Sequence, residues 1–274
     1  MPVSNDFFDT FADFRDQYVI IGGMAASIIM EQKHFVFRPT RDYDMVVFFE
    51  LTTADFSKTL LRYLADKHYE LTGIKEMEGS SNYYRFTLPK DKLSDGDYQA
   101  NDPQMIELFS RIPVSFIDPH IPTHLIPLPY FGYTSLSAIV LDNNYYELIK
   151  HGVEIVNQDQ PILRPEYLIL FKMKAFLDIQ QRHQAGEQIN HRDLNKHLYD
   201  VIRLLQIVEP ENQLDLENMK APVKNDVQVF IHILEEMIDL NKRLTKVLFD
   251  DNTKLSAMTD KAEIINDLKQ LFML

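Results

Sequence analysis

YVIIGGMAASIIMEQKHFVFRPTRDYDMVVFFE, residues Tyr18 to Glu50, contains the elements from which we predict the architecture of the chain. The apolar run YVII predicts a buried strand, and Gly22 and Gly23 separate it from a predicted helix that reaches about Lys33. After a loop, a second strand begins with the letters DYD and continues as MVVFF. This strand, turn, helix and strand form the unit that contains the candidate site.

Asp42 and Asp44 are two acidic residues at the start of the second strand. Successive strand side chains point to opposite faces, so these two share one face, about 6 to 7 Å apart along the backbone. The rest of the strand is apolar, which predicts a buried position, and buried carboxylates are costly unless they are neutralised or bind a cation. Because carboxylate oxygens suit magnesium, the pair predicts a site for Mg²⁺ or Mn²⁺. Acids that only flank and cap a strand are the alternative interpretation.

The glycine pair Gly22 and Gly23 follows a buried strand and precedes a helix. Glycine permits a tight turn and the close approach of a ligand, while the first turn of the helix offers unpaired N–H groups and a positive dipole end. These features together predict a phosphate site. A strand-to-helix turn that needs glycine only for steric reasons is the alternative.

The order of these residues carries a family resemblance. A glycine pair followed by R-x-T-x-D-x-D, here Arg38, Thr40, Asp42 and Asp44, resembles the signature of the nucleotidyltransferase fold shared with DNA polymerase beta. It is most similar to the AbiEii-like branch, which includes toxins of type IV toxin–antitoxin systems. The resemblance implies that the glycine turn, Arg38 and Thr40 bind a nucleoside triphosphate and that the two acids hold magnesium. It also implies that a third acid on a neighbouring strand completes the site.

Glu107 is our candidate for this third acid. The segment Met105 to Ser110 alternates, so that Glu107 shares one strand face with Met105 and Phe109. The other candidate is Asp118, which ends the apolar segment VSFID. Glu107 is also the acid that we expect to help deprotonate an attacking hydroxyl. A solvent-facing charge on an edge strand is the alternative interpretation of Glu107.

The character of the sequence changes near Pro161. Residues 1–160 alternate between strand and helix patterns, whereas residues 161–274 show only amphipathic helix patterns, at 165–182, 193–208, 223–249 and 259–272. We therefore predict an α+β protein, with a nucleotidyltransferase-like mixed sheet flanked by helices in 1–160 and a helical domain in 161–274.

The helical part extends the resemblance. RPEYLILFKMKAFLDIQQR at 164–182 and HRDLNKHLYDVIRLL at 191–205 resemble the P-E-x-L-x-x-x-K-x-x-A … R … K-x-x-x-D pattern of AbiEii-like proteins. Lys172, Arg182, Lys196 and Asp200 match that pattern, which implies that Lys172 projects toward the nucleotide phosphates. The family often has Lys-Asp where this chain has Lys196 and His197, which departs from the pattern at the second position. Alternatively, Lys172 extends from a packed helix and Asp200 pairs with Lys196 one turn away.

Composition narrows the class of protein. The 274 residues carry a formal net charge of −13, which disfavours broad binding to nucleic-acid backbone. The chain has no cysteine, so disulfides and thiolate metal sites are excluded. The acidic start resembles no signal peptide, and no apolar run approaches membrane-spanning length, so we expect a cytoplasmic, bacterial protein with no membrane partner.

The resemblance implies a metal-dependent nucleotidyltransferase that moves a nucleoside monophosphate from an NTP to a hydroxyl of RNA such as tRNA, of a protein or of a small molecule. A toxin of this branch would have an antitoxin as its partner. A non-catalytic module of the same fold, which binds nucleotide or another protein, is the first alternative. An unrelated α+β protein in which the glycine pair and D-x-D coincide by chance is the second.

Overall fold

The computed structural model describes residues 6–72, 85–89, 102–111, 125–127, 137–140, 142–189, 191–242, 244 and 260–274. The chain divides into two compact units, and each is described by itself. The first contains Met1–Ala25 and Thr40–Leu163, and the second contains Ala26–Pro39 and Arg164–Leu274. The second unit therefore includes a short segment that interrupts the first in the sequence. Strands and helices together confirm the predicted α+β class.

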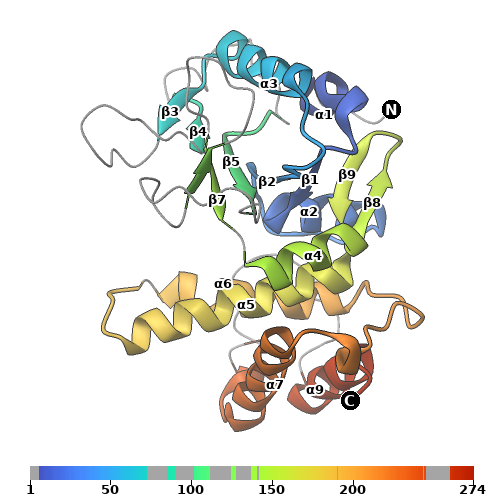
Figure 1. Ribbon diagram of the computed structural model, residues 1–274. Coiled ribbons are helices and arrows are strands. Elements are labelled where there is room, and N and C mark those ends of the chain that lie inside the picture. Colours follow the sequence, from blue (N-terminus) through green and yellow to red (C-terminus); the bar gives the residue numbers. More distant parts are fainter. Residues whose placement is uncertain are drawn as a thin grey trace. The chain divides into compact units, whose positions relative to one another are not determined.

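A mixed β-sheet forms the centre of the first unit (Figure 1). Its strands are β1 Tyr18–Ile21, β2 Asp42–Val47, β3 Glu70–Thr72, β4 Arg85–Thr87, β5 Met105–Ser110, β6 Leu125–Pro127, β7 Ser137–Val140, β8 Val153–Val156 and β9 Gln160–Leu163. Among the described residues the order is β3-β4-β5-β2-β1-β9-β8, with β7 paired to β5 and β6. β2 runs antiparallel to β1 and parallel to β5, which makes it a central strand.

Helices α1 (Asp6–Phe11) and α3 (Ala54–Asp66) pack on one face of this sheet. An aromatic core joins them to the strands, since the ring of Phe7 lies 5.0 Å from Tyr43 and 5.6 Å from Tyr63. Thr53 caps α3 by accepting a hydrogen bond from the backbone N–H of Phe56. Burial of these rings fixes which face of β2 points to the core.

Helices dominate the second unit: α5 Pro165–Gln184, α6 His191–Leu205, α7 Ala221–Glu236 and α9 Lys261–Leu271, with the short turn η3 at Leu216–Asn218. α5 and α6 lie side by side (Figure 1), and the ring of Phe176 on α5 packs 5.4 Å from that of Phe230 on α7. The predicted helix 223–249 is interrupted, because Met237 takes an extended conformation and ends α7; the chain is helical again at 240–242, and 245–249 lie outside the described residues. None of the helices in the described part of the chain combines the length and apolar character needed to cross a bilayer.

Candidate functional site

The register of the sheet brings two of the predicted acids together. Asp44 on β2 is the direct partner of Glu107 on the parallel strand β5, and such partners point to the same face. Asp42 shares this face by alternation, whereas Tyr43 points to the opposite face, where it packs on Phe7. We call Asp42, Asp44 and Glu107 the carboxylate face of the first unit.

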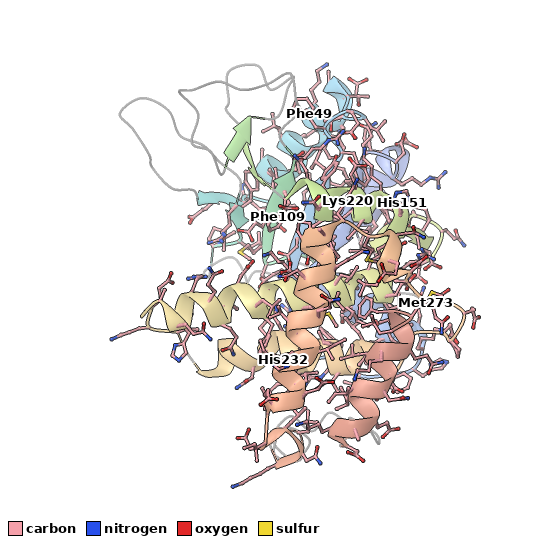
Figure 2. All side chains as sticks on the ribbon, turned by 60° about the horizontal axis from the view of Figure 1, so that its bottom comes forward. Phe49, Phe109, His151, Lys220, His232 and Met273 are labelled. Carbon is pink, nitrogen blue, oxygen red and sulfur yellow. The ribbon has the colours of Figure 1, made fainter. Side chains whose placement is uncertain are left out.

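Exposure varies across the carboxylate face. Asp42 is exposed and Asp44 is half-buried, whereas Glu107 is only 8% exposed. Phe109, two residues farther along β5 on the same face, is half-buried (labelled in Figure 2). A carboxylate as buried as Glu107 requires a compensating charge.

Arg85 supplies that compensating charge. It is the direct partner of Glu107 on the antiparallel strand β4, and its Nε and Nη2 donate to Glu107 Oε1 at 2.9 and 2.5 Å. Arg85 was not among the predicted site residues. Its place in the strand-like run NYYRFTL was a partial signal, because an arginine on a strand can pair with an acid on a neighbouring strand, but the run does not reveal which strand that is.

Gly22 lies directly against Asp44. Its φ of +70° is in the left-handed region that favours glycine. A Cβ built on Gly22 would lie 3.0 Å from Asp44 Cγ and 3.3 Å from its Cβ, and closer still to Oδ2. Glycine is therefore required here both by the backbone and by the approach of Asp44. Gly22 and Gly23 are the first residues of helix α2 (Gly22–Gln32), so the glycine turn, the helix start and the acid are adjacent.

The carboxylate face has the donor chemistry that Mg²⁺ or Mn²⁺ prefers, since it offers oxygen atoms from three acids. Among the described residues, no group of three or more Asp, Glu, His or Cys side chains is arranged to hold a metal ion. Glu107 is instead paired with the guanidinium of Arg85. The three carboxylates are thus of the kind that binds Mg²⁺ or Mn²⁺, but Glu107 forms an ion pair with Arg85 in this structure. The alternative third ligand, Asp118, lies outside the described residues.

A second charged site lies in the second unit around Asp200 of α6, which is completely buried. Arg38 donates from Nε and Nη2 to the two oxygens of Asp200 at 3.0 and 2.9 Å. Lys172 Nζ on α5 lies 2.9 Å from Oδ2, and Arg203 Nη1 lies 3.4 Å from Oδ1. We call these four residues the Asp200 cluster. It joins the segment before β2 to two helices that are distant from it in the sequence.

The Asp200 cluster shifts the pKa of two groups. Burial tends to raise the pKa of Asp200, but the charges of Lys172 and Arg38 outweigh it and lower that pKa to about 2. Burial, followed by the charge of Lys172, lowers the pKa of His197 to about 4. The Nδ1 atom of His197 is buried and has no hydrogen-bond partner among the described residues. At neutral pH, Asp200 is therefore ionised and His197 is neutral.

The other predicted residues are distributed over both units. Thr40 is half-buried in the first unit, just before β2. Lys196 is half-buried on α6, one turn before Asp200. Arg182 is largely exposed and pairs with Glu187 at 2.7 Å, which is a surface contact. The sequence analysis missed Arg203, although an arginine three residues after Asp200 on a helix is a recognisable pairing signal.

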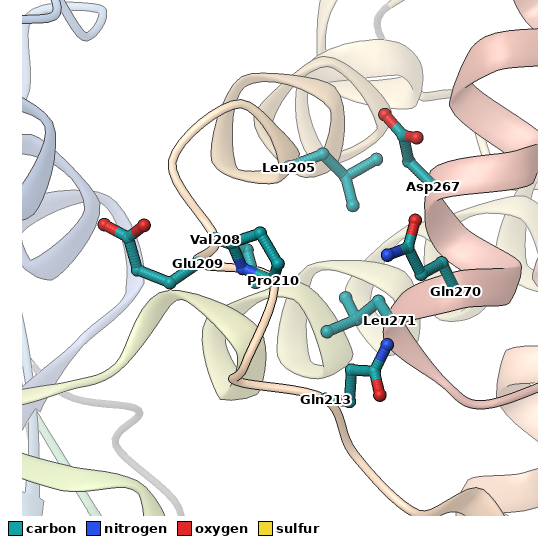
Figure 3. Close-up of a pocket in the computed structure, with 8 residues that line it drawn as sticks. All are labelled: Leu205, Val208, Glu209, Pro210, Gln213, Asp267, Gln270 and Leu271. Atoms are coloured by element: carbon teal, nitrogen blue, oxygen red, sulfur yellow. The ribbon is translucent and has the colours of Figure 1, made fainter.

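A small pocket in the second unit lies between the end of α6 and α9 (Figure 3). It is lined by Leu205, Val208, Glu209, Pro210, Gln213, Asp267, Gln270 and Leu271. Its volume of about 180 Å³ is below the range typical of ligand sites. It contains no residue of the carboxylate face or of the Asp200 cluster.

Comparison with known proteins assigns no family to the chain: no protein-family model and no curated protein matches it. A function is therefore inferred from the residues themselves. The carboxylate face beside Gly22 and the buried Asp200 cluster are the two arrangements that offer chemistry.

Proposed function

We propose that this chain is a metal-dependent nucleotidyltransferase that transfers a nucleoside monophosphate from an NTP to a hydroxyl group, with pyrophosphate as the leaving group. The observation that carries the proposal is the contact between Gly22 and Asp44. A glycine turn at a helix start suits a phosphate, and a carboxylate suits the divalent cation that accompanies a phosphate. The pairing of Ile21 with Asp44 places residue 44 beside the turn, and a carboxylate at that position would set a cation next to the phosphates.

The residues of the first unit divide into three roles under this proposal. Asp42, Asp44 and Glu107 would hold Mg²⁺ or Mn²⁺, which when bound neutralises negative charge on the transferred phosphate. Gly22 and Gly23 would let the phosphates approach the backbone N–H groups at the start of α2, which orient them. Glu107 would also accept the proton of the acceptor hydroxyl once Arg85 no longer occupies it.

The Asp200 cluster supports a nucleotide substrate independently. Arg38, Lys172 and Arg203 bring three positive charges to the single carboxylate of Asp200. Arg and Lys side chains suit phosphate as well as carboxylate, and Arg38, whose side chain is 21% exposed, would be the group of this cluster that reaches a phosphate. Thr40 in the first unit and Lys196 in the second would each offer a further polar contact to the nucleotide.

The acceptor is RNA such as tRNA, a protein or a small molecule, and the resemblance to the AbiEii-like branch extends the proposal to a toxin with an antitoxin partner. The test is incubation with each NTP labelled at the α-phosphate, together with total RNA and cell lysate. We expect label on one acceptor class, and its loss in the Asp42→Ala/Asp44→Ala variant. Equal labelling by that variant, or no labelling with any NTP, would contradict the proposal.

A non-catalytic nucleotide-binding or protein-interaction module is the second candidate, and the pairing of Arg85 with Glu107 favours it. In a module that does not use a metal, Glu107 can stay paired with Arg85. Isothermal titration with each NTP, with and without Mg²⁺, separates the two functions. Binding that is independent of Mg²⁺ supports the module, whereas binding that requires Mg²⁺ supports the transferase.

A further inference from the structure

The ion pair between Arg85 and Glu107 is fixed by the sheet. The two residues are direct partners on β4 and β5, so their side chains leave the backbone side by side on one face. Both hydrogen bonds from the guanidinium end on the same oxygen, Oε1. The neighbour of Glu107 on its other side is Asp44, so Glu107 lies between an arginine and an acid.

The two partners differ in burial. The side chain of Glu107 is 11% exposed, whereas that of Arg85 is 45% exposed. The guanidinium of Arg85 is therefore already in contact with water, whereas Glu107 cannot be left buried and charged without a partner. Loss of Arg85 from Glu107 therefore requires another cation to take its place.

We propose that Arg85 is a positioning residue that keeps Glu107 neutralised and in place until a divalent cation replaces it on the carboxylate face. The inference rests on the proposed function, because it concerns the same metal site. Arg85 competes with the metal for Glu107, so the affinity of the site for the metal is lower than its three carboxylates alone would give. The exposed guanidinium, once released, stays on the face that binds the substrate.

A second arginine of the first unit provides a matched control. Arg111 pairs with Glu50 at 3.0 Å and with Glu147 at 2.6 Å, and all three side chains are at least 29% exposed. Glu50 also accepts hydrogen bonds from Lys150 and from the Tyr146 hydroxyl. This arginine therefore belongs to a surface network that includes no residue of the carboxylate face, and Arg111→Gln should leave metal affinity unchanged.

The test is titration of the full chain with Mn²⁺ alone, with free Mn²⁺ measured by electron paramagnetic resonance. We expect Arg85→Gln to bind Mn²⁺ about three- to tenfold more tightly than wild type, as expected when a partly exposed charged competitor is removed. In the Glu107→Gln background, Arg85→Gln should have no such effect, because the shared carboxylate is gone. Circular dichroism melting curves show that each variant is folded.

Equal Mn²⁺ affinity of wild type and Arg85→Gln overturns the role of Arg85. If Asp42→Ala/Asp44→Ala still abolishes Mn²⁺ binding in that case, the proposed metal site survives. If Arg85→Gln still binds Mn²⁺ more tightly in the Glu107→Gln background, the role of Arg85 is also overturned, because the effect would then come from the general change in charge. Absence of Mn²⁺ binding by every variant, Arg85→Gln included, overturns both the role of Arg85 and the metal site.

Discussion

The carboxylate face and the Asp200 cluster use the same kinds of side chain in opposite proportions. In the first, one of three acids, Glu107, pairs with an arginine, and the other two acids are half-buried or exposed. In the second, three cations share one completely buried acid. Carboxylates that reach solvent, such as those of Asp42 and Asp44, suit a bound cation. The buried Asp200, with its three partners, instead links segments that are distant in the sequence. Under our proposal, Asp200 stabilises its unit and positions Arg38 and Lys172, whereas Asp42 and Asp44 would hold the cation.

The largest expected effect is on stability at Asp200. Asp200→Ala leaves Lys172, Arg38 and Arg203 without their shared acid, and breaking such a buried pair costs about 3–5 kcal/mol. Urea unfolding monitored by circular dichroism measures this loss. Asp42→Ala, at an exposed position, should change the free energy of unfolding by less than about 0.5 kcal/mol.

Asp178→Ala is the control for the Asp200 variant. Asp178 lies on α5, is half exposed, and pairs with Lys174 at 3.0 Å one turn away. Its removal should cost less than about 1 kcal/mol. If the Asp200 and Asp178 variants lose similar stability, or if Asp42→Ala is the most destabilising of the three, the contrast between the two sites is wrong.

The next effect is a dependence of stability on pH that comes from His197. Its pKa is about 4 in the folded chain and near 6.5 when unfolded, so the unfolded state binds the proton first as the pH falls. Stability is therefore complete above pH 6.5 and falls by about 3 kcal/mol between pH 6.5 and pH 4. Unfolding free energies of His197→Gln should be flatter over this window. An identical dependence of the unfolding free energy on pH in the variant would contradict the lowered pKa of His197.

Asp200 acts over a lower window. Its pKa is lowered from an ordinary 3.8 to about 2, so its contribution is present above about pH 4 and is lost as the pH falls toward 2. This lowering of the pKa corresponds to about 2 kcal/mol of the free energy of unfolding. Comparison of wild type with Asp200→Asn between pH 4 and pH 2 measures it. A wild type that loses no more stability than the variant over that range would contradict the shift.

The last prediction concerns the glycine turn. Gly22→Ala meets both a positive φ and the Asp44 side chain, so we expect a loss of about 2–3 kcal/mol. Gly186 has a φ of +96° but nothing within 4 Å of an added Cβ, so Gly186→Ala should cost only about 1 kcal/mol. Thermal unfolding of both variants gives the comparison. Equal losses would mean that Asp44 does not restrict the turn.

The local elements could be predicted from the sequence because their patterns are local. Alternation located β5 at Met105–Ser110, and the D-x-D pattern located the start of β2 at Asp42. The length of α7 could not be predicted, because the amphipathic pattern continues past Met237 without a glycine or proline, and tertiary packing decides where the helix ends.

The partners of the site residues depended on contacts between distant segments. Arg85 could be assigned to Glu107 only once β4 and β5 were known to be neighbours, because alternation alone does not reveal which strands pair. Asp200 was considered a partner of Lys196 on its own helix, but Arg38 reaches it from a segment more than 160 residues away in the sequence. Burial of Asp200, which makes this contact important, is also a tertiary property.

The most direct test of the central idea is a crystal of the full chain soaked with Mn²⁺ and a non-hydrolysable NTP, measured for anomalous scattering from manganese. We predict a peak bound by Asp42, Asp44 and Glu107, with the triphosphate against Gly22 and Gly23 and with Arg85 moved away from Glu107. A peak at any other place, or an empty carboxylate face with Arg85 still on Glu107, would contradict it.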